Sequence, residues 1–537
     1  MLTENWRHGK KQLTVTLISL QACPCSAMLL AFTAMGLEHQ ISQAVAPPAE
    51  LLPLGIVGLT GHRELRDPAR IKTAIYQVLQ ELKQKCGGRL LTFSSIASGA
   101  DALFAEESIA LQLPWKVVLP FSKEFYLKSV TDEERRVVSR YLEKAYAVET
   151  MPLSEQQEDL YLNCGVRTVD DCDVLLAVWD GEPARGKGGT ADVVAYAHQV
   201  KKPVIWIHAI TGAIRREDFV DEFWRDAELE ALNAIPEPKV RLAPWSPDIP
   251  SELTCFFAKV DAVATGIAPR FRRLTALTIL LHLAATLTAL VALAFVLDWI
   301  LWPWLKVIFV VGAGVAGVYL AWKESHHHWI RCRLAAEICR SFIATWHIPN
   351  VFAPVALHDF PHLKGLLRVL RYRKELASHH LARDFDSVKD RYLQDRVENQ
   401  RQYYHLQELT AAPLLRWLNG LFWLGTILAI VTALLFALAE TTDSHLIEGA
   451  GKVILFHILP LAAPAVAGCA LSLISVYDLK RRLSRYRQMQ AELINAKSRI
   501  EACQTWDNLQ RAVEQTEHLL VAEVVEWYST AKYAGAH

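Results

Sequence analysis

The sequence has no excess of charge of either sign. Its 57 lysine and arginine residues balance 57 aspartate and glutamate residues, so the formal net charge is zero. Proteins that bind nucleic acid through their surface carry a basic excess, whereas the basic residues here occur only in short clusters. We therefore expect no direct nucleic-acid partner.

Paired cysteines are also missing. The ten cysteines are scattered over 537 residues without CxxC spacing, which indicates neither a zinc knuckle nor a disulfide framework. We interpret them as reduced thiols on the cytosolic side or in the membrane. The histidines 326–328, with His379 and His380, lack the carboxylate and cysteine spacing of a defined metal site. We interpret these histidines as interfacial polar residues and expect no metal and no cofactor.

Long apolar runs are present instead, and 52% of the residues are hydrophobic. A hydrocarbon core of about 30 Å needs about 20 residues, and four stretches fit it: residues 274–297, 305–322, 417–438 and 453–476. They form two hairpins with short loops at 298–304 and 439–451 and basic outer flanks, including Arg270 and Lys480. The positive-inside rule then predicts a multi-pass protein of the bacterial inner (cytoplasmic) membrane, with its soluble parts in the cytosol.

The first 50 residues allow two interpretations. Basic residues at Arg7, Lys10 and Lys11 precede an apolar run at 13–20, as in an export signal. The alternative is a mispredicted start or a loosely folded extension. We favour the extension, because export would place a nucleotide site outside the cell.

Residues 54–208 alternate between short apolar strands and helices. The predicted strands are 54–58, 90–93, 116–119, 174–179 and 203–207, and the predicted helices are 68–85, 100–111, segments of 131–168, and 190–200. Short strands that are apolar throughout are typical of a parallel sheet covered by helices on both faces. The predicted fold class is therefore α/β, with a Rossmann-like parallel sheet, followed by a helical four-span membrane module with cytosolic helices.

A glycine-rich loop follows the predicted strand 174–179 and leads into a helix. Gly188 and Gly189 carry no Cβ, so their backbone N–H groups can approach an anion, and the helix that begins near Thr190 directs its positive dipole end to the same place. Asp180 and Gly181 precede the loop. This pattern predicts a site for a negatively charged, nucleotide-like ligand.

Two other strand ends carry small and polar residues. The first is followed by Gly58, Thr60, Gly61 and Arg63, and the second by Ser98, Gly99 and Asp101. Each has an ordinary explanation: a tight turn with a surface arginine in the first case, and in the second a helix start with Ser98 as the N-cap and Asp101 favouring the dipole. Parallel topology brings all three ends to one edge of the sheet, which favours a shared ligand pocket.

These segments together resemble a known family. Residues 58–63, 98–101 with Glu106, 119–121, 173–181 and 188–190 look like the SLOG branch of the Rossmann-like nucleotide-binding folds, related to the Smf/DprA and LOG proteins. The resemblance covers residues 51 to about 260. It implies that the domain either senses a nucleotide-derived ligand or, as in LOG enzymes, cleaves nucleoside monophosphates.

The enzymatic alternative depends on one glutamate. LOG-type hydrolases carry a GGxGTxxE loop, and the position of its glutamate is Val193 here. Asp192 is acidic but one residue away, about 100° around a helix. We therefore expect no enzymatic activity. The alternative is a membrane-tethered hydrolase that uses Glu106, Asp180 or Asp192.

The membrane half resembles the SLATT group, two-transmembrane effector modules associated with SLOG domains. The residues that carry this resemblance are Trp329, Arg333, Ala336, Glu337, Arg340, Tyr392, Arg396, Gln402, Tyr403, Tyr404, Glu523, Glu526 and Trp527. Such modules are proposed to form pores in anti-phage immunity. The alternative for any single residue is a role in a salt-bridged helical bundle.

Within the spans, small residues at 312–317 permit close helix packing and therefore oligomerisation. His282 and His457 either are hydrogen-bonded within a helix bundle or act in gating. No row of charged residues predicts the ion selectivity of a pore.

The sequence as a whole predicts a sensor-effector in which a cytosolic domain binds a nucleotide-derived second messenger and a homo-oligomeric membrane module perturbs the lipid bilayer. The alternatives are the hydrolase and a nucleotide-regulated scaffold or transporter subunit. The predicted parts are an extension (1–50), the SLOG-like domain (51–268), a first hairpin (269–324), a helical region (325–412), a second hairpin (413–477) and C-terminal helices (478–537).

Overall fold

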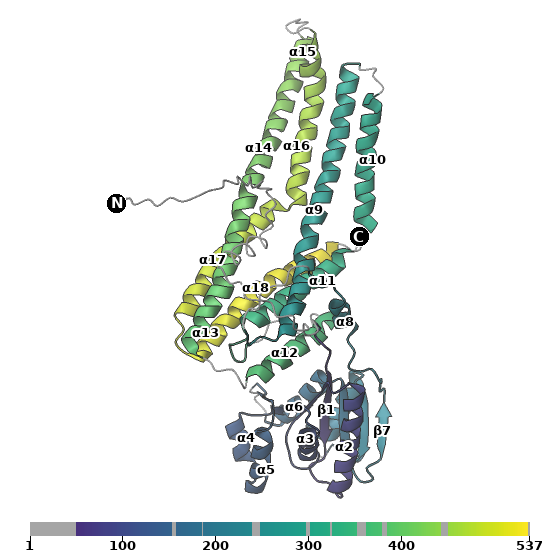
Figure 1. Cartoon of the computed structure of the whole chain (residues 1–537), viewed down its shortest axis with the longest axis vertical. Helices are drawn as coiled ribbons and strands as arrows, with labels where there is room; N and C mark the ends of the chain where they lie inside the picture. Colours follow the sequence, from purple (N-terminus) through teal and green to yellow (C-terminus); the bar gives the residue numbers. More distant parts are fainter. Residues whose placement is uncertain are drawn as a thin grey trace, which may run out of the picture. The chain divides into compact units, whose positions relative to one another are not determined.

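The structure is a computed structural model, shown in Figure 1. It describes residues 50–152, 157–184, 186–238, 247–296, 301–322, 325–351, 361–378, 384–441 and 449–534. Within these ranges an N-terminal α/β domain is followed by a helical region with four candidate membrane-spanning helices. The predicted fold class is therefore confirmed. Residues 1–49 of the predicted N-terminal extension, His379 and His380 lie outside the described residues.

The α/β domain contains a seven-stranded sheet in the order β4-β3-β2-β1-β5-β6-β7. Its strands are β1 (Gly55–Gly61), β2 (Leu90–Ser94), β3 (Trp115–Leu119), β4 (Ala147–Thr150), β5 (Val174–Trp179), β6 (Val204–His208) and β7 (Ile214–Glu217). All neighbouring strands pair in parallel except β7, which pairs antiparallel with β6. The sheet is therefore of the parallel type that the apolar strands predicted.

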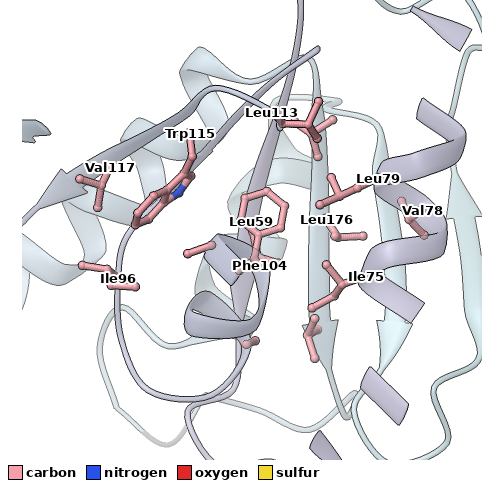
Figure 2. Close-up of a cluster of buried hydrophobic side chains, with 14 of the residues drawn as sticks. Leu59, Ile75, Val78, Leu79, Ile96, Phe104, Leu113, Trp115, Val117 and Leu176 are labelled. Carbon is pink, nitrogen blue, oxygen red and sulfur yellow. The ribbon is translucent and has the colours of Figure 1, made fainter. Parts of the chain in front are cut away.

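Helices cover both faces of this sheet. Successive side chains of a strand point to opposite faces of the sheet, as two neighbouring residues of β5 show. Leu176 packs with Leu59 and with the helices α2 (Pro68–Lys85) and α3 (Ala100–Ala110), as Figure 2 shows. Leu175 packs on the other face, with α6 (Gln157–Asp171) and α7 (Thr190–Gln199). Three shorter helices complete the domain: α4 (Lys123–Ser129), α5 (Asp132–Leu142) and α8 (Ala227–Asn233).

Strand β4 differs from the prediction, which gave residues 131–168 only helical segments. Residues 147–150 instead form an edge strand beside β3. Its alternation of half-buried and exposed side chains, with a charged Glu149, lacks the continuous apolar character of the inner strands. The sequence pattern used for buried strands therefore could not detect it.

The first compact unit consists of residues 274–317 and 399–492 and holds the membrane-spanning parts. Its elements are the second half of α9 (Ser251–Ala294), α10 (Leu301–Trp322), α14 (Asn399–Thr441), α15 (Ala450–Val453), the π-helical turn η3 (Ile454–Ile458), α16 (Leu459–Val476) and most of α17 (Leu479–Glu501). Gly425 lets α14 approach α16 closely, because a Cβ at this position would lie 2.8 Å from the carbonyl oxygen of Ala463. Small residues thus set the packing of the second hairpin.

The second unit joins the α/β domain to the remaining helices. These are α11 (Ser325–Ala344), the short turn η1 (Pro361–Leu363), α12 (Lys364–Ser378), α13 (Phe385–Tyr392), the π-helical turn η2 (Leu393–Glu398) and α18 (Trp506–Ala534). One hydrophobic core contains side chains of α8, the first half of α9, α11, α12 and α18, among them Phe256, Phe342 and Leu367. This core links the helix that enters the first membrane span to the helices beside the sheet.

The cysteines of the described part are free thiols, and most are buried. Burial raises the pKa of Cys86 and Cys172 to about 12.

Candidate functional site

Three loops meet at the carboxyl edge of the sheet, because β2, β1 and β5 are neighbouring parallel strands. The predicted site residues lie on them as follows: Thr60, Gly61 and Arg63 at the end of β1; Ser98, Gly99 and Asp101 at the start of α3; Asp180, Gly181, Gly188, Gly189 and Thr190 between β5 and α7. The structure therefore brings these segments to one edge. Gly58 is the exception, since it lies within β1 and faces Thr168 of α6 and Cys172, which follows that helix.

Gly99 fixes the contact between two of the loops. Its φ angle is +81°, and a Cβ here would lie 2.2 Å from the carbonyl oxygen of Arg63. The N–H of Ala100 donates to the carbonyl oxygen of His62 at 3.0 Å. Only glycine combines this backbone conformation with such close approach. The start of α3 and the end of β1 are consequently in direct backbone contact.

The start of α3 differs from the prediction that Ser98 caps it. The N-cap residue is Gly99, which has no side chain to accept a hydrogen bond. The close approach to β1 requires glycine at this position, and the Ser98 side chain instead helps to lower the pKa of Glu134 of α5.

Asp101 is a nearly buried carboxyl group beside a cation. It is 8% exposed, and burial raises its pKa to about 7 although the Arg63 guanidinium and a backbone hydrogen bond lower it. The guanidinium of Arg63 lies 5.6 Å from the centre of the Tyr161 ring on α6. The edge therefore offers a cation on an aromatic face, next to an acid that can carry a proton near neutral pH.

His62 and Asp180 connect the ends of β1 and β5. The Nε2 atom of His62 lies 2.9 Å from Oδ1 of Asp180, and the pair is partly buried. Burial raises the pKa of Asp180, but the N–H of Glu182 and the His62 ring outweigh it, so the pKa is lowered overall. Sequence reasoning gave His62 and Tyr161 no role. The position of His62 within the run at 58–63 was the one available signal.

A hydrogen bond to the first turn of α7 fixes the glycine-rich loop. Gly188 has φ +80°, and its N–H donates to Oδ2 of Asp192 at 2.9 Å. Asp192, in the first turn of α7, thus uses one of the N–H groups that an anion would need. Val193 is buried against Gly165 of α6, and Glu106 of α3 forms an ion pair with Lys72 of α2 at 2.9 Å.

A second charged cluster lies in the helical region. Arg396 of η2 is buried and donates to Glu517 of α18 and Glu337 of α11, at 2.8 Å from its Nη2 atom in each case. The hydroxyl of Tyr392 also donates to Glu517 at 2.8 Å. Although burial raises the pKa of Glu337, Arg340 and Arg396 lower it to about 2. Ionised groups therefore join η2, α11 and α18. The sequence analysis named Arg396 and Glu337 but did not identify Glu517.

Helix α12 connects the helical region to the sheet, at the edge opposite the loops. Arg368 of α12 forms an ion pair with Asp173, the residue before β5, at 2.5 Å. Asp173 also accepts the N–H of Ile56, at 3.0 Å, in β1. Lys116 of β3 lies 3.2 Å from Glu375 of α12 and 3.0 Å from Glu149 of β4. Strands β1, β5, β3 and β4 are thereby tied to this helix.

No group of three or more histidine, cysteine, aspartate or glutamate side chains within the described residues could hold a metal ion.

Comparison with protein families gives two matches in the helical region. Residues 255–349 match the family described as SMODS and SLOG-associating 2TM effector domain 3, and residues 392–527 match SMODS and SLOG-associating 2TM effector domain 1. No curated protein matches the chain. The two matches include the four apolar helices and indicate a multi-pass membrane protein. Both lie C-terminal to the sheet, so the chain joins an α/β domain to a helical region with two segments that match SLATT domains.

Proposed function

We propose that the chain is a membrane-bound sensor-effector. Its α/β domain binds a nucleotide-derived signal at the carboxyl edge of the sheet, and its SLATT module then permeabilises the bacterial inner membrane during anti-phage defence. The observation that carries the proposal is the meeting of three glycine-bearing loops at one sheet edge, in a chain whose helical region matches membrane effector domains.

The ligand is expected to be anionic. Its phosphate would lie at Gly188, Gly189 and Thr190, where the N-terminus of α7 supplies N–H groups, and Arg63 would supply a full positive charge. The base could stack beside Tyr161, whose ring already accepts the Arg63 guanidinium. Because Asp192 accepts the Gly188 N–H, a phosphate would compete with this carboxylate for the donor.

The signal would pass through α12 and the hydrophobic core it shares with α9. Arg368 links α12 to β5 and, through Asp173, to β1. The side chains of α12 and the first half of α9 belong to one hydrophobic core. A ligand changes the membrane module only if it binds one state of the assembly more tightly than another. A shift of β1 or β5 on binding would alter the Arg368 contact and supply that difference.

We propose no enzymatic turnover. The hydrolase glutamate position is occupied by Val193, a buried residue packed on α6, and Asp192 already accepts a backbone N–H. Release of free base from nucleoside monophosphates by the purified chain would favour the hydrolase instead.

The test is membrane integrity in bacteria that express the full chain. Uptake of an excluded dye is measured with and without phage, for the wild type, Gly189→Arg, Arg63→Ala and the control Arg66→Ala, an exposed arginine on the same loop. Phage-dependent uptake that both site variants lose and the control retains supports the proposal. Absence of uptake in the wild type under every condition would contradict the effector function and favour a scaffold or transporter subunit.

A further inference from the structure

The membrane segment of α9 carries a polar stripe. Residues 274–294 contain no charged side chain, but four polar residues recur at positions i, i+3, i+7 and i+11: Thr275, Thr278, His282 and Thr286. In a helix with 3.6 residues per turn these positions share one face. Leu277 and Leu280 lie on the opposite side of the same turns.

This stripe is not covered by the neighbouring helix of the hairpin. His282 and Thr286 are exposed, and Thr278 is partly exposed. The contact with α10 involves the adjacent face of α9, where Leu281 lies near Gly312: a Cβ on this glycine would be 3.5 Å from the leucine Cδ1 atom. Leu277 and Leu280 are each 46% exposed as well. The membrane segment thus presents one polar and one apolar exposed face.

The threonines can satisfy their hydroxyl groups within the helix. Thr278 donates to the carbonyl oxygen of Leu274 at 3.0 Å, and Thr286 donates to that of His282 at 2.9 Å. Such bonds to the carbonyl four residues earlier are how hydroxyl groups are accommodated in membrane helices. The threonines alone would therefore be compatible with lipid.

His282 is different because it has two polar ring nitrogens. Its Nδ1 atom lies 2.8 Å from the carbonyl oxygen of Thr278, and within the described residues no partner contacts its Nε2 atom. An unpaired polar group in hydrocarbon is strongly unfavourable. Water would satisfy this nitrogen, and an ionisable side chain inside a membrane span commonly marks a polar pathway.

We infer that the face of α9 formed by Thr278, His282 and Thr286 lines a water-filled path through the membrane in the assembled effector. This inference rests on the proposed function. It adds to that function the face of α9 that contacts water and ions. A wall of hydroxyl and imidazole groups without fixed carboxylates or ammonium groups would admit small hydrated ions of both signs.

The test uses cysteine substitutions in the full chain, reconstituted into lipid vesicles. His282→Cys and Thr286→Cys are compared with Leu280→Cys and Ala284→Cys, which lie on the opposite face, each within two residues, or about 3 Å along the axis, of a stripe position. The unsubstituted chain gives the background of the native thiols. A charged, membrane-impermeant methanethiosulfonate is supplied to both sides of the bilayer. Because the thiolate is the reactive form and does not form in lipid, the stripe positions are expected to react at least about tenfold faster.

Two outcomes overturn the inference: equal labelling of the two faces, or no labelling at either stripe position. Leakage of a trapped dye from the same vesicles is measured separately. Leakage without labelling at 282 or 286 would leave the proposed function standing and refute this assignment of the path. Labelling without leakage would support the water-lined face and contradict membrane permeabilisation. The two substitutions at different turns of α9 guard against a single variant that fails to fold.

Discussion

Gly99 lies directly against the backbone of Arg63, so that a single added methyl group at position 99 would lie 2.2 Å from the Arg63 carbonyl oxygen. The neighbouring carbonyl oxygen of His62 would be at 2.4 Å. Since both of these residues sit at the candidate ligand edge, the geometry of the edge depends on the absence of a side chain at position 99.

Gly99→Ala is therefore expected to destabilise the protein and to displace Arg63. The matched control is Gly87→Ala, where φ is also positive (+58°) but no atom lies within 4 Å of the added Cβ. A left-handed backbone costs an alanine about 1 kcal/mol. Gly99 combines φ +81° with ψ −125°, which lies outside the regions open to residues with a Cβ, and its variant also has to move backbone. Thermal unfolding of the detergent-solubilised chain should show the larger loss for Gly99→Ala. Equal losses would mean that the contact with Arg63 contributes nothing.

This contact also shows what the sequence could reveal. The run at 98–101 predicted a helix start at the sheet edge, and the structure places it there, but the prediction of Ser98 as the N-cap was wrong. A cap preference depends on local sequence, whereas the need for glycine at position 99 arises from a chain segment more than thirty residues away. Local patterns do not contain that information.

A conservative substitution in the buried cluster around Arg396 is expected to cause a large loss of stability. Glu517→Gln keeps the size of the side chain but removes one of the two carboxylates that pair with a buried arginine. Breaking a buried ion pair by removing one partner costs roughly 3–5 kcal/mol. We expect a clear fall in thermal stability, whereas Glu514→Gln at an exposed position of the same helix serves as the comparison.

The cluster around Arg396 also predicts how stability changes with pH. Ion pairs hold the pKa of Glu337 at about 2, below its value in the unfolded chain. Their contribution to stability is thus complete at neutral pH and is lost as the pH falls from about 4 towards 2. Wild type and Glu337→Gln should therefore converge in stability in strong acid. A difference that stays constant down to the acid limit would argue against an ionised Glu337.

The Asp101 carboxyl group is expected to make stability fall, rather than rise, with increasing pH. Its pKa of about 7 lies above that of an unfolded aspartate, so the folded chain holds a proton that the unfolded chain releases. The stability contributed by neutral Asp101 is present below about pH 4 and declines until the pH passes about 7. Asp101→Asn cannot ionise and should gain more stability relative to wild type at pH 8 than at pH 5. Asp132→Asn, at an exposed position of α5, is the control.

Two glycine-to-alanine substitutions in the second hairpin are expected to change stability in opposite directions. Alanine at Gly420 meets no neighbouring atom and should stabilise α14 by up to about 1 kcal/mol. Alanine at Gly425 would lie 2.8 Å from the Ala463 carbonyl oxygen and 3.1 Å from the Ala467 Cβ, and overpacking of this kind costs about 1–3 kcal/mol. Thermal unfolding in detergent distinguishes the two. Stabilisation by both would show that α14 and α16 do not need the close contact.

Apolar patterns predicted most of the fold because burial on both faces leaves a strong signature in the sequence. The strand at 174–179 and the helix at 68–85 have the predicted bounds. Edge strand β4 and the partners of Arg396 were not predictable in this way: Glu149 and Glu517 are polar residues whose positions depend on contacts distant in sequence. The contact of His62 with Asp180 belongs to the same class, since 118 residues separate the two side chains.

The Arg396 cluster also constrains how such a chain can change over time. Replacing all of its charged members with well-packed apolar residues could leave stability unaffected or even improve it. Every single step towards that state, however, leaves a charge buried without its partner. Positions 337, 396 and 517, which lie far apart in the sequence, are thus expected to be inherited as a set and to be exchanged together or not at all.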